Sequence, residues 1–178
     1  RTLVWQTEDE QRSEGGGVVK TSPGYEANRA RISLALSEFT VPLLSRIYHA
    51  FDGGMVAALV LGEIAHRNVE VWLTQYDNSE DLLQDPARRE KLMRPCNALS
   101  ISEACGLPRE TVRRKIVMLI DRGYVYRSGE GFLFLTRTVG NDFEDMTAKN
   151  VEALLTTARR LETLLANQPT PLGPLRLD

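Results

Sequence analysis

Four charged side chains are concentrated in the six residues RETVRR, at positions 109–114. An arginine guanidinium donates N–H groups from a planar fork, so it can bind phosphate or bridge O6 and N7 of guanine. A glutamate can accept a hydrogen bond from N4 of cytosine. On an ideal helix with about 100° per residue, Glu110, Arg113 and Arg114 fall on one face. The apolar residues of this helix fall on the other face, which is expected to pack: Val112, Ile116, Leu119 and Ile120.

The residues around the start of this stretch predict a helix, a tight turn and a second helix. Ser100 and Glu103 have the spacing of a capping box, so a short helix is expected to begin at Ile101. Gly106 can adopt the left-handed conformation that ends a helix. Pro108 suits the first turn of the second helix, where a missing N–H costs nothing.

After Gly123 the apolar spacing changes from that of a helix to that of a strand. Residues 124–127 and 132–135 are rich in aromatic and aliphatic side chains, and they flank the turn residues Ser-Gly-Glu-Gly at 128–131. The pattern predicts a short two-stranded hairpin directly after the second helix.

Residues 98–138 together resemble a winged helix-turn-helix, and RETVRR is similar to the recognition helix of the bacterial Crp/Fnr-type regulators. In that family the first Arg, the adjacent Glu and the Arg four residues after that Glu read base edges in the major groove. The resemblance therefore implies base reading by Arg109, Glu110 and Arg114. Four further residues on the second helix and the hairpin are expected to contact DNA phosphate: Thr111, Arg113, Lys115 and Arg127.

The layout of the chain resembles MarR-type regulators, with long helices on both sides of the winged segment and Leu135-Thr136 closing the second wing strand. The expected fold is mainly α: a winged helix-turn-helix with long flanking helices and a short two-stranded β-wing. The resemblance implies a homodimer on double-stranded DNA, because such regulators usually read two half-sites with two copies. Whether a small-molecule effector binds is left open.

The polar, glycine-rich residues 1–24 are expected to form a flexible N-terminal arm. Residues 25–76 are expected to be a helical dimerisation and scaffold region. Helical spacing at residues 25–51 is interrupted by Pro42, which either kinks this helix or divides it, with Thr40 as the second cap.

A second long helix is predicted at residues 55–76. Its first half is apolar nearly all round, as expected for a helix at the centre of a bundle, so we expect it to be the hub of the fold. Trp72 and Tyr76 extend its apolar stripe and belong either to the core or to a ligand pocket.

Residues 77–97 are polar and predict a linker with a short helix, which begins at Asp85-Pro86 and ends near Met93. Basic residues in this linker either meet phosphate beside the second helix or form a solvated face: Arg88, Arg89, Lys91 and Arg94.

Residues 139–168 predict a C-terminal dimerisation helix, which is expected to begin at Asn141 because Asn141 and Glu144 have capping-box spacing. Apolar residues then follow with steps of 3, 4, 3 and 4: Val151, Leu154, Ala158, Leu161 and Leu165. This seam pairs with a second copy or packs on its own chain, and the exposed position of a terminal helix favours the dimer. Prolines predict an extended tail at residues 169–178.

The distribution of charge along the chain supports a nucleic-acid partner better than the net charge of the whole chain does. The 178 residues are 42% hydrophobic, enough for a globular domain with its own core, and their net charge is −2. Residues 97–137, however, contain seven Lys and Arg against four Asp and Glu, a local charge of +3. Positive charge is thus concentrated where the motif lies.

The sequence gives little support for catalysis, a cofactor or a metal site. Cys96 and Cys105 lack the ligand spacings of a zinc site and are expected to be reduced thiols in a cytoplasm. Cys105 is interpreted as a packing residue, with redox sensing as the alternative. His49 and His66 have no catalytic pattern around them. The most apolar run, residues 55–61, is far too short for a membrane span.

We therefore expect a sequence-specific DNA-binding transcriptional regulator, with a winged-helix protein interaction module as the alternative. The arginines on the solvent face of the second helix favour phosphate and bases over a protein partner. Val117 and Met118 on the same side either contact thymine methyl groups or pack against another helix. The second possibility keeps the alternative open, because exposed apolar residues often mark interfaces.

Overall fold

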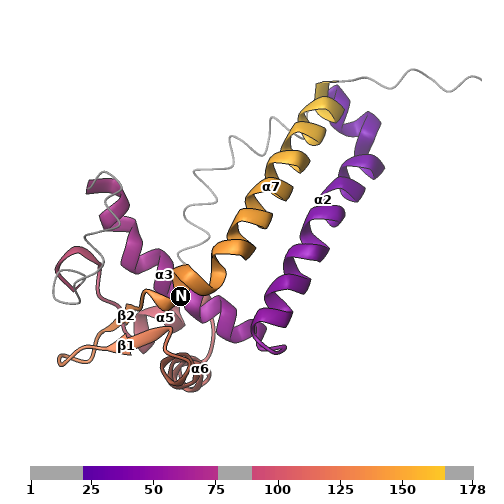
Figure 1. Cartoon of the computed structure of the whole chain (residues 1–178). Coiled ribbons are helices and arrows are strands. Elements are labelled where there is room, and N and C mark those ends of the chain that lie inside the picture. Colours follow the sequence, from indigo (N-terminus) through magenta and orange to yellow (C-terminus); the bar gives the residue numbers. More distant parts are fainter. Residues whose placement is uncertain (1–21, 76–89, 167–178) are drawn as a thin grey trace, which may run out of the picture. The chain divides into compact units, whose positions relative to one another are not determined.

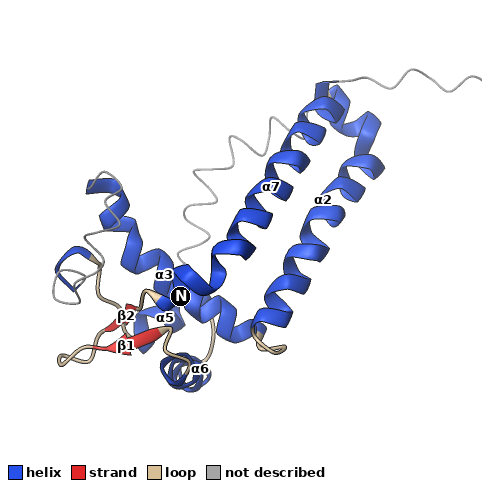
Figure 2. Cartoon of the chain, viewed as in Figure 1, coloured by secondary structure: helices blue, strands red, loops and turns tan. Residues whose placement is uncertain are grey.

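The computed structural model describes residues 22–75 and 90–166, and it describes side chains at 22–70 and 90–166. The prediction of a mainly helical chain with a small two-stranded antiparallel sheet is confirmed (Figures 1 and 2). The elements follow the order α2 (Pro23–Ala50), α3 (Met55–Gln75), α5 (Ala98–Cys105), α6 (Arg109–Asp121), β1 (Val125–Arg127), β2 (Leu133–Leu135) and α7 (Thr138–Ala166).

The chain divides into two compact units, and the division falls inside α2 and α7. We call Ile47–Asp145 the core unit. The described residues of the other unit, 22–46 and 146–166, form what we call the two-helix unit. The predicted arm at 1–24 and the predicted tail at 169–178 lie outside the described residues, except for residues 22–24.

Helix α3 is the hub of the core unit, as predicted, because it packs against α5, α6 and β2. Fully buried side chains from every one of these elements form one apolar cluster: Ala57, Val60, Ile64, Ile101, Val112, Ile116, Leu119, Val125 and Leu133. The predicted scaffold region at 25–76 contains both α2 and α3. In the structure, α3 packs in one core with the helices and strands that follow it in the sequence. Burial of these aliphatic side chains is the main stabilising term for the unit.

Helix α5 begins at Ala98, so the predicted start at Ile101 is wrong. Asn97 is the cap: its side-chain oxygen accepts hydrogen bonds from the N–H groups of Leu99 and Ser100, both at 3.0 Å. The N–H of Asn97 donates to Ser100 Oγ at 3.1 Å, which completes a capping box. Ser100 therefore lies inside the box instead of starting it. The predicted exit is confirmed, since Gly106 has φ of +64°.

The predicted hairpin is confirmed. Strand β1 pairs antiparallel with β2, and Arg127 lies opposite Leu133. The turn is closed by hydrogen bonds from the N–H of Ser128 to the carbonyl of Phe132 at 2.8 Å and from the N–H of Gly131 to the carbonyl of Ser128 at 2.9 Å. Gly131 has φ of +89°, a backbone conformation that residues other than glycine rarely adopt.

The predicted division of the first long helix and the predicted start of the last one are wrong. Helix α2 begins at Pro23 and continues through Pro42, so Thr40 is not a second cap; its non-helical backbone angles are at Asn28. Pro42 has no N–H to donate to the carbonyl of Glu38, so that carbonyl lacks its helical hydrogen bond. Both residues are exposed on α2, so water can bind the carbonyl instead. Helix α7 begins at Thr138, so Asn141 is an internal residue and not a cap.

In the two-helix unit, α2 and α7 run side by side in opposite directions (Figure 1). Asn28 Nδ2 donates to the carbonyl of Leu164 at 2.9 Å, and Arg46 Nε donates to Asn150 Oδ1 at 2.8 Å. A Cβ at Gly24 would come within 1.9 Å of the Leu165 carbonyl oxygen, so only glycine allows this approach. Both ends of the helix pair are therefore fixed by polar contacts.

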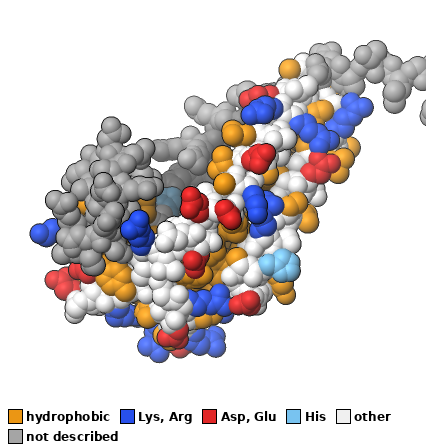
Figure 3. Space-filling model, viewed as in Figure 1, with side chains coloured by type: hydrophobic (Ala, Val, Ile, Leu, Met, Phe, Trp, Pro, Cys, Tyr) orange, Lys and Arg blue, Asp and Glu red, His pale blue; other side chains and the backbone are white. Residues whose placement is uncertain are grey.

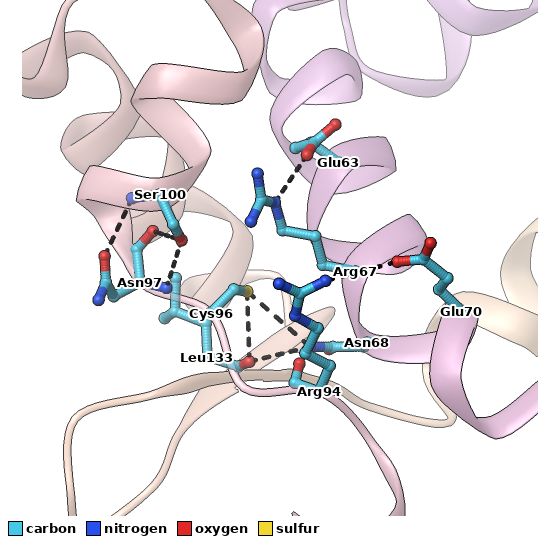
Figure 4. A network of polar contacts seen from close by, with 9 residues as sticks. All are labelled: Glu63, Arg67, Asn68, Glu70, Arg94, Cys96, Asn97, Ser100 and Leu133. Carbon is cyan, nitrogen blue, oxygen red and sulfur yellow. Dashed lines mark hydrogen bonds and ion pairs between the residues drawn. The ribbon is translucent and has the colours of Figure 1, made fainter. Parts of the chain in front are cut away.

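Asn68 of α3 connects three segments of the core unit (Figure 4). Its side chain is fully buried. The amide nitrogen donates to the carbonyls of Arg94 at 2.9 Å and Leu133 at 3.2 Å, and the amide oxygen accepts from the N–H of Leu135 at 2.9 Å. The N–H of Leu133 donates to the Cys96 carbonyl at 2.8 Å, so the segment before α5 is paired with β2 on the edge opposite β1.

Replacing Asn68 is expected to destabilise the core unit strongly. Asn68→Ala leaves buried backbone groups without partners, which should lower the free energy of unfolding by about 2–4 kcal/mol. Urea denaturation followed by circular dichroism measures the change. Asn141→Ala is the matched control, because this exposed amide is not a cap and its loss should cost less than about 0.5 kcal/mol. Equal losses in the two variants would contradict the role given to Asn68.

Candidate nucleic-acid interface

Helix α6 divides into a buried face and a charged solvent face, as its sequence predicts. Val112, Ile116 and Leu119 are fully buried against α3 and its neighbours. The predicted base-reading residues, Arg109, Glu110 and Arg114, are all exposed, and so is Arg113. In Figure 3, Lys and Arg side chains gather at the lower edge of the view, where Figure 1 places α6.

Glu110 and Arg113 form an ion pair that was not among the predicted features. Arg113 Nε donates to Glu110 Oε2 at 3.0 Å, and both side chains are 66% exposed. Their i, i+3 spacing on a helix was the signal that could have shown it. A pair this exposed contributes no more than about 1 kcal/mol, so either partner can leave it for a stronger contact.

Three arginines from two elements line a groove in the core unit. Arg109 and Arg113 come from α6, and Arg127 comes from β1. The groove has a volume of about 490 Å³ and its remaining lining comes from the start of α5 and the hairpin turn: Asn97, Ala98, Leu99, Glu130, Gly131 and Phe132. We call it the arginine groove. Of the three predicted base-reading residues, Arg109 lines this groove and Glu110 and Arg114 do not.

The guanidinium of Arg127 is held by the hairpin turn. Arg127 Nη1 donates to the carbonyl of Gly131 at 3.0 Å. This bond occupies one donor of the guanidinium, which has five. The rest of the fork remains available at the groove.

The other predicted phosphate residues lie elsewhere on α6. Thr111 and Lys115 are half-buried, and neither lines the arginine groove. Among the apolar residues left unexplained by the sequence, Met118 packs against the core, whereas Val117 is 54% exposed. On the helix, Glu110, Arg114 and Val117 follow each other at steps of four and three residues. These three side chains therefore form the outermost stripe of α6.

Two further basic residues of the core unit are already paired. Arg122 Nη2 lies 2.6 Å from Asp52 Oδ2, and Arg94 Nη1 lies 3.7 Å from Glu70 Oε2. In the predicted basic cluster of the linker, Arg88 and Arg89 lie outside the described residues, as does the predicted cap at Asp85-Pro86. The side chain of Trp72 and all of Tyr76 are also outside the described part of the chain, so both alternatives for these residues, the core or a ligand pocket, stay open.

Burial raises the pKa of both cysteine thiols, although Cys96 is buried and Cys105 is only partly buried. Burial raises the pKa of Cys96 to about 11, and the positive charge of Arg67 only partly opposes this. Burial also raises the pKa of Cys105, and the negative charge of Glu63 adds to the effect. Both are free thiols. A higher pKa leaves less of the reactive thiolate at neutral pH, which favours packing over redox sensing for Cys105.

No group of three or more His, Cys, Asp and Glu side chains in residues 22–70 and 90–166 is placed to hold a metal ion. His49 and His66 are exposed, and the ring of His49 meets that of Tyr48 edge-on at 5.7 Å. Within the described part of the chain, no single helix is both long and apolar enough to cross a membrane, although α2 and the first part of α3 meet that requirement as a broken pair.

Comparisons with protein-family models, with curated proteins and with solved structures found no match to this chain.

The raised thiol pKa predicts slow alkylation of Cys96 in the folded protein. At pH 8 a group with a pKa of about 11 is roughly 0.1% thiolate, so iodoacetamide should label it far more slowly than in the unfolded chain. Its labelling rate should continue to rise above pH 10, beyond the point where an ordinary thiol levels off. Peptide mass analysis after timed labelling separates Cys96 from Cys105, and guanidinium-unfolded protein is the control. Native and unfolded rates that coincide would contradict the burial of this thiol.

Proposed function

We propose that the chain is a sequence-specific DNA-binding transcriptional regulator that reads double-stranded DNA as a homodimer. In this proposal α5, α6 and the β1–β2 hairpin act as a winged helix-turn-helix, with α6 in the major groove. The observation that carries the proposal is the solvent face of α6, where Arg109, Arg113 and Arg114 are all exposed. The helix has a packed opposite face and is followed by a short hairpin, which suits insertion into a groove about 12 Å wide.

The outermost stripe of α6 is proposed to read bases. Arg114 is suited to bridging O6 and N7 of guanine, and Glu110 to accepting from N4 of cytosine. Val117, which is exposed on the same stripe, is suited to apolar contact with a thymine methyl group. These assignments give a role to an exposed apolar side chain on an otherwise charged surface.

The rival function is a protein interaction module, and Val117 is the observation that favours it. A protein partner would use an exposed apolar centre with charges around it. On α6, however, one exposed apolar residue stands among three exposed arginines. That composition favours a polyanion.

DNA binding is expected to weaken steeply with salt, and two substitutions should separate base reading from charge. The probe is a duplex recovered by selection from random DNA. Arg114→Ala should cost about 1–3 kcal/mol on that duplex and relax the preference at one base pair. Lys115→Ala, on the flank of α6, should weaken selected and scrambled duplexes alike and reduce the salt slope by about 1. Competition assays at several salt concentrations measure both effects.

Two results would count against this division. Equal loss of affinity for both duplexes in Arg114→Ala would remove base reading by that residue. Binding that stays constant between low and moderate salt would remove the electrostatic contact itself, because neutralised phosphates release counterions and make affinity depend on salt.

A homodimer is proposed because the two-helix unit exposes large apolar side chains that its own two helices leave uncovered. On α7, Val151 and Leu154 of the predicted seam are half exposed, while Ala158, Leu161 and Leu165 are partly buried. In the part of α2 that belongs to the two-helix unit, four large apolar residues are exposed as well: Leu34, Leu36, Val41 and Leu44. A second copy would remove this surface from water and bring two α6 helices to two half-sites.

Substitution of the exposed seam is expected to weaken the dimer without unfolding the chain. Leu154→Glu places a charge at the centre of the proposed interface and should shift sedimentation at micromolar concentration from dimer toward monomer. Leu59→Glu is the matched control, since Leu59 is also an exposed leucine but belongs to the core unit. A wild-type monomer at that concentration, or equal shifts in the two variants, would contradict this interface.

A further inference from the structure

We infer that the arginine groove binds one phosphate group of the DNA backbone and so sets the register of α6. This inference rests on the proposed function, but it assigns a specific ligand to a specific place. It also changes one assignment made from the sequence, because Arg109 becomes a phosphate-binding residue instead of a base-reading residue.

The charges that line the groove favour an oxyanion. Arg109, Arg113 and Arg127 contribute three positive charges, and Glu130 contributes one negative charge. The three arginines come from two elements and line one groove of about 490 Å³. Phosphate offers several acceptor oxygens to such planar donors, and charge-assisted bonds of this kind are the stronger class.

Two of the arginines make bonds that leave donors available. Arg127 uses Nη1 for the Gly131 carbonyl, and Arg113 uses Nε for Glu110. Each therefore keeps N–H groups for a ligand. The bond to the turn carbonyl partly fixes Arg127, so this side chain loses less conformational entropy when a phosphate binds.

The arginines, not the start of α5, supply the binding groups. The N–H groups of Leu99 and Ser100 are occupied by the side chain of Asn97. An anion in the groove therefore meets an end of α5 that is already capped. We therefore expect that removing any one of the three groove arginines weakens phosphate binding.

A phosphate held between α6 and the hairpin would fix the helix relative to the DNA backbone. Arg109 and Arg113 are then directed to that phosphate, while Glu110 and Arg114 lie on the stripe that we propose reads bases. Phosphate contacts position a protein on the duplex and base contacts specify the sequence. The groove thus supplies the positioning that the base contacts need.

The decisive experiment combines two changes: one DNA phosphate is made neutral, and one groove arginine is replaced by a neutral side chain. A duplex recovered by selection is prepared as a series in which one phosphate at a time is replaced by an uncharged methylphosphonate. One position in each half-site should weaken binding of the wild-type protein by about tenfold. With Arg127→Gln or Arg113→Gln, the same modification should weaken binding clearly less than it does in the wild type, because one of the three arginine contacts to that phosphate is already lost.

Two variants make the test independent of folding defects. Glu130→Gln removes the negative charge from the groove and should increase affinity for the unmodified duplex several-fold, an effect that damage to the fold would not produce. Arg137→Gln removes an exposed arginine that does not line the groove, so it should keep the full methylphosphonate effect. Loss of the effect in Arg137→Gln as well would overturn the assignment.

The outcomes separate this inference from the proposed function. If the wild-type protein binds the duplex but no modified phosphate couples to Arg127 or Arg113, the groove assignment is wrong and DNA binding stands. If no duplex is retained from the selection, the proposed function is wrong and the inference with it. Binding of adenosine monophosphate that depends on Arg127, without duplex binding, would identify a free nucleotide as the ligand and overturn the DNA backbone as its source.

Discussion

The buried side chain of Asn68 is the interaction on which the geometry of the core unit depends. An amide placed among aliphatic side chains is costly unless each of its polar groups finds a partner. In this protein the partners are backbone groups of Arg94, Leu133 and Leu135, from segments far apart in the sequence. One side chain thus fixes the hairpin and the chain before α5 to α3. Apolar packing alone would hold these segments together without fixing their register.

The two segments that lead into the arginine groove, the start of α5 and the hairpin, are both positioned by hydrogen bonds of this network. The bond from the N–H of Leu133 to the Cys96 carbonyl sets the position of the chain just before Asn97, which caps α5. Leu133 is also paired with Arg127 across the hairpin. Helix α5 leads through a tight turn into α6, so the positions of all three groove arginines trace back to α3. A polar contact in the interior therefore determines how charges are arranged at the surface.

The sequence predicted those features of the fold that depend on local pattern. The two faces of α6 and the hairpin were predicted because apolar spacing and glycine positions are local signals. The start of α5 was predicted wrongly because two pairs of residues have capping-box spacing. These are Asn97 with Ser100, which form the box, and Ser100 with Glu103, and spacing alone does not decide between them. The arginine groove could not be predicted, because it joins α6 to a hairpin residue whose position depends on long-range contacts.

The pair between Glu110 and Arg113 suits a surface that exchanges internal contacts for external ones. Because both side chains are mostly in water, separating them costs no more than about 1 kcal/mol. Charge-assisted bonds to phosphate and to a base edge are each worth more than that. In the free protein the pair offsets part of the positive charge of α6, which weakens attraction to unrelated anions. A ligand that offers phosphate and bases together would engage both residues at once, so the proposed surface favours duplex DNA over a simple anion.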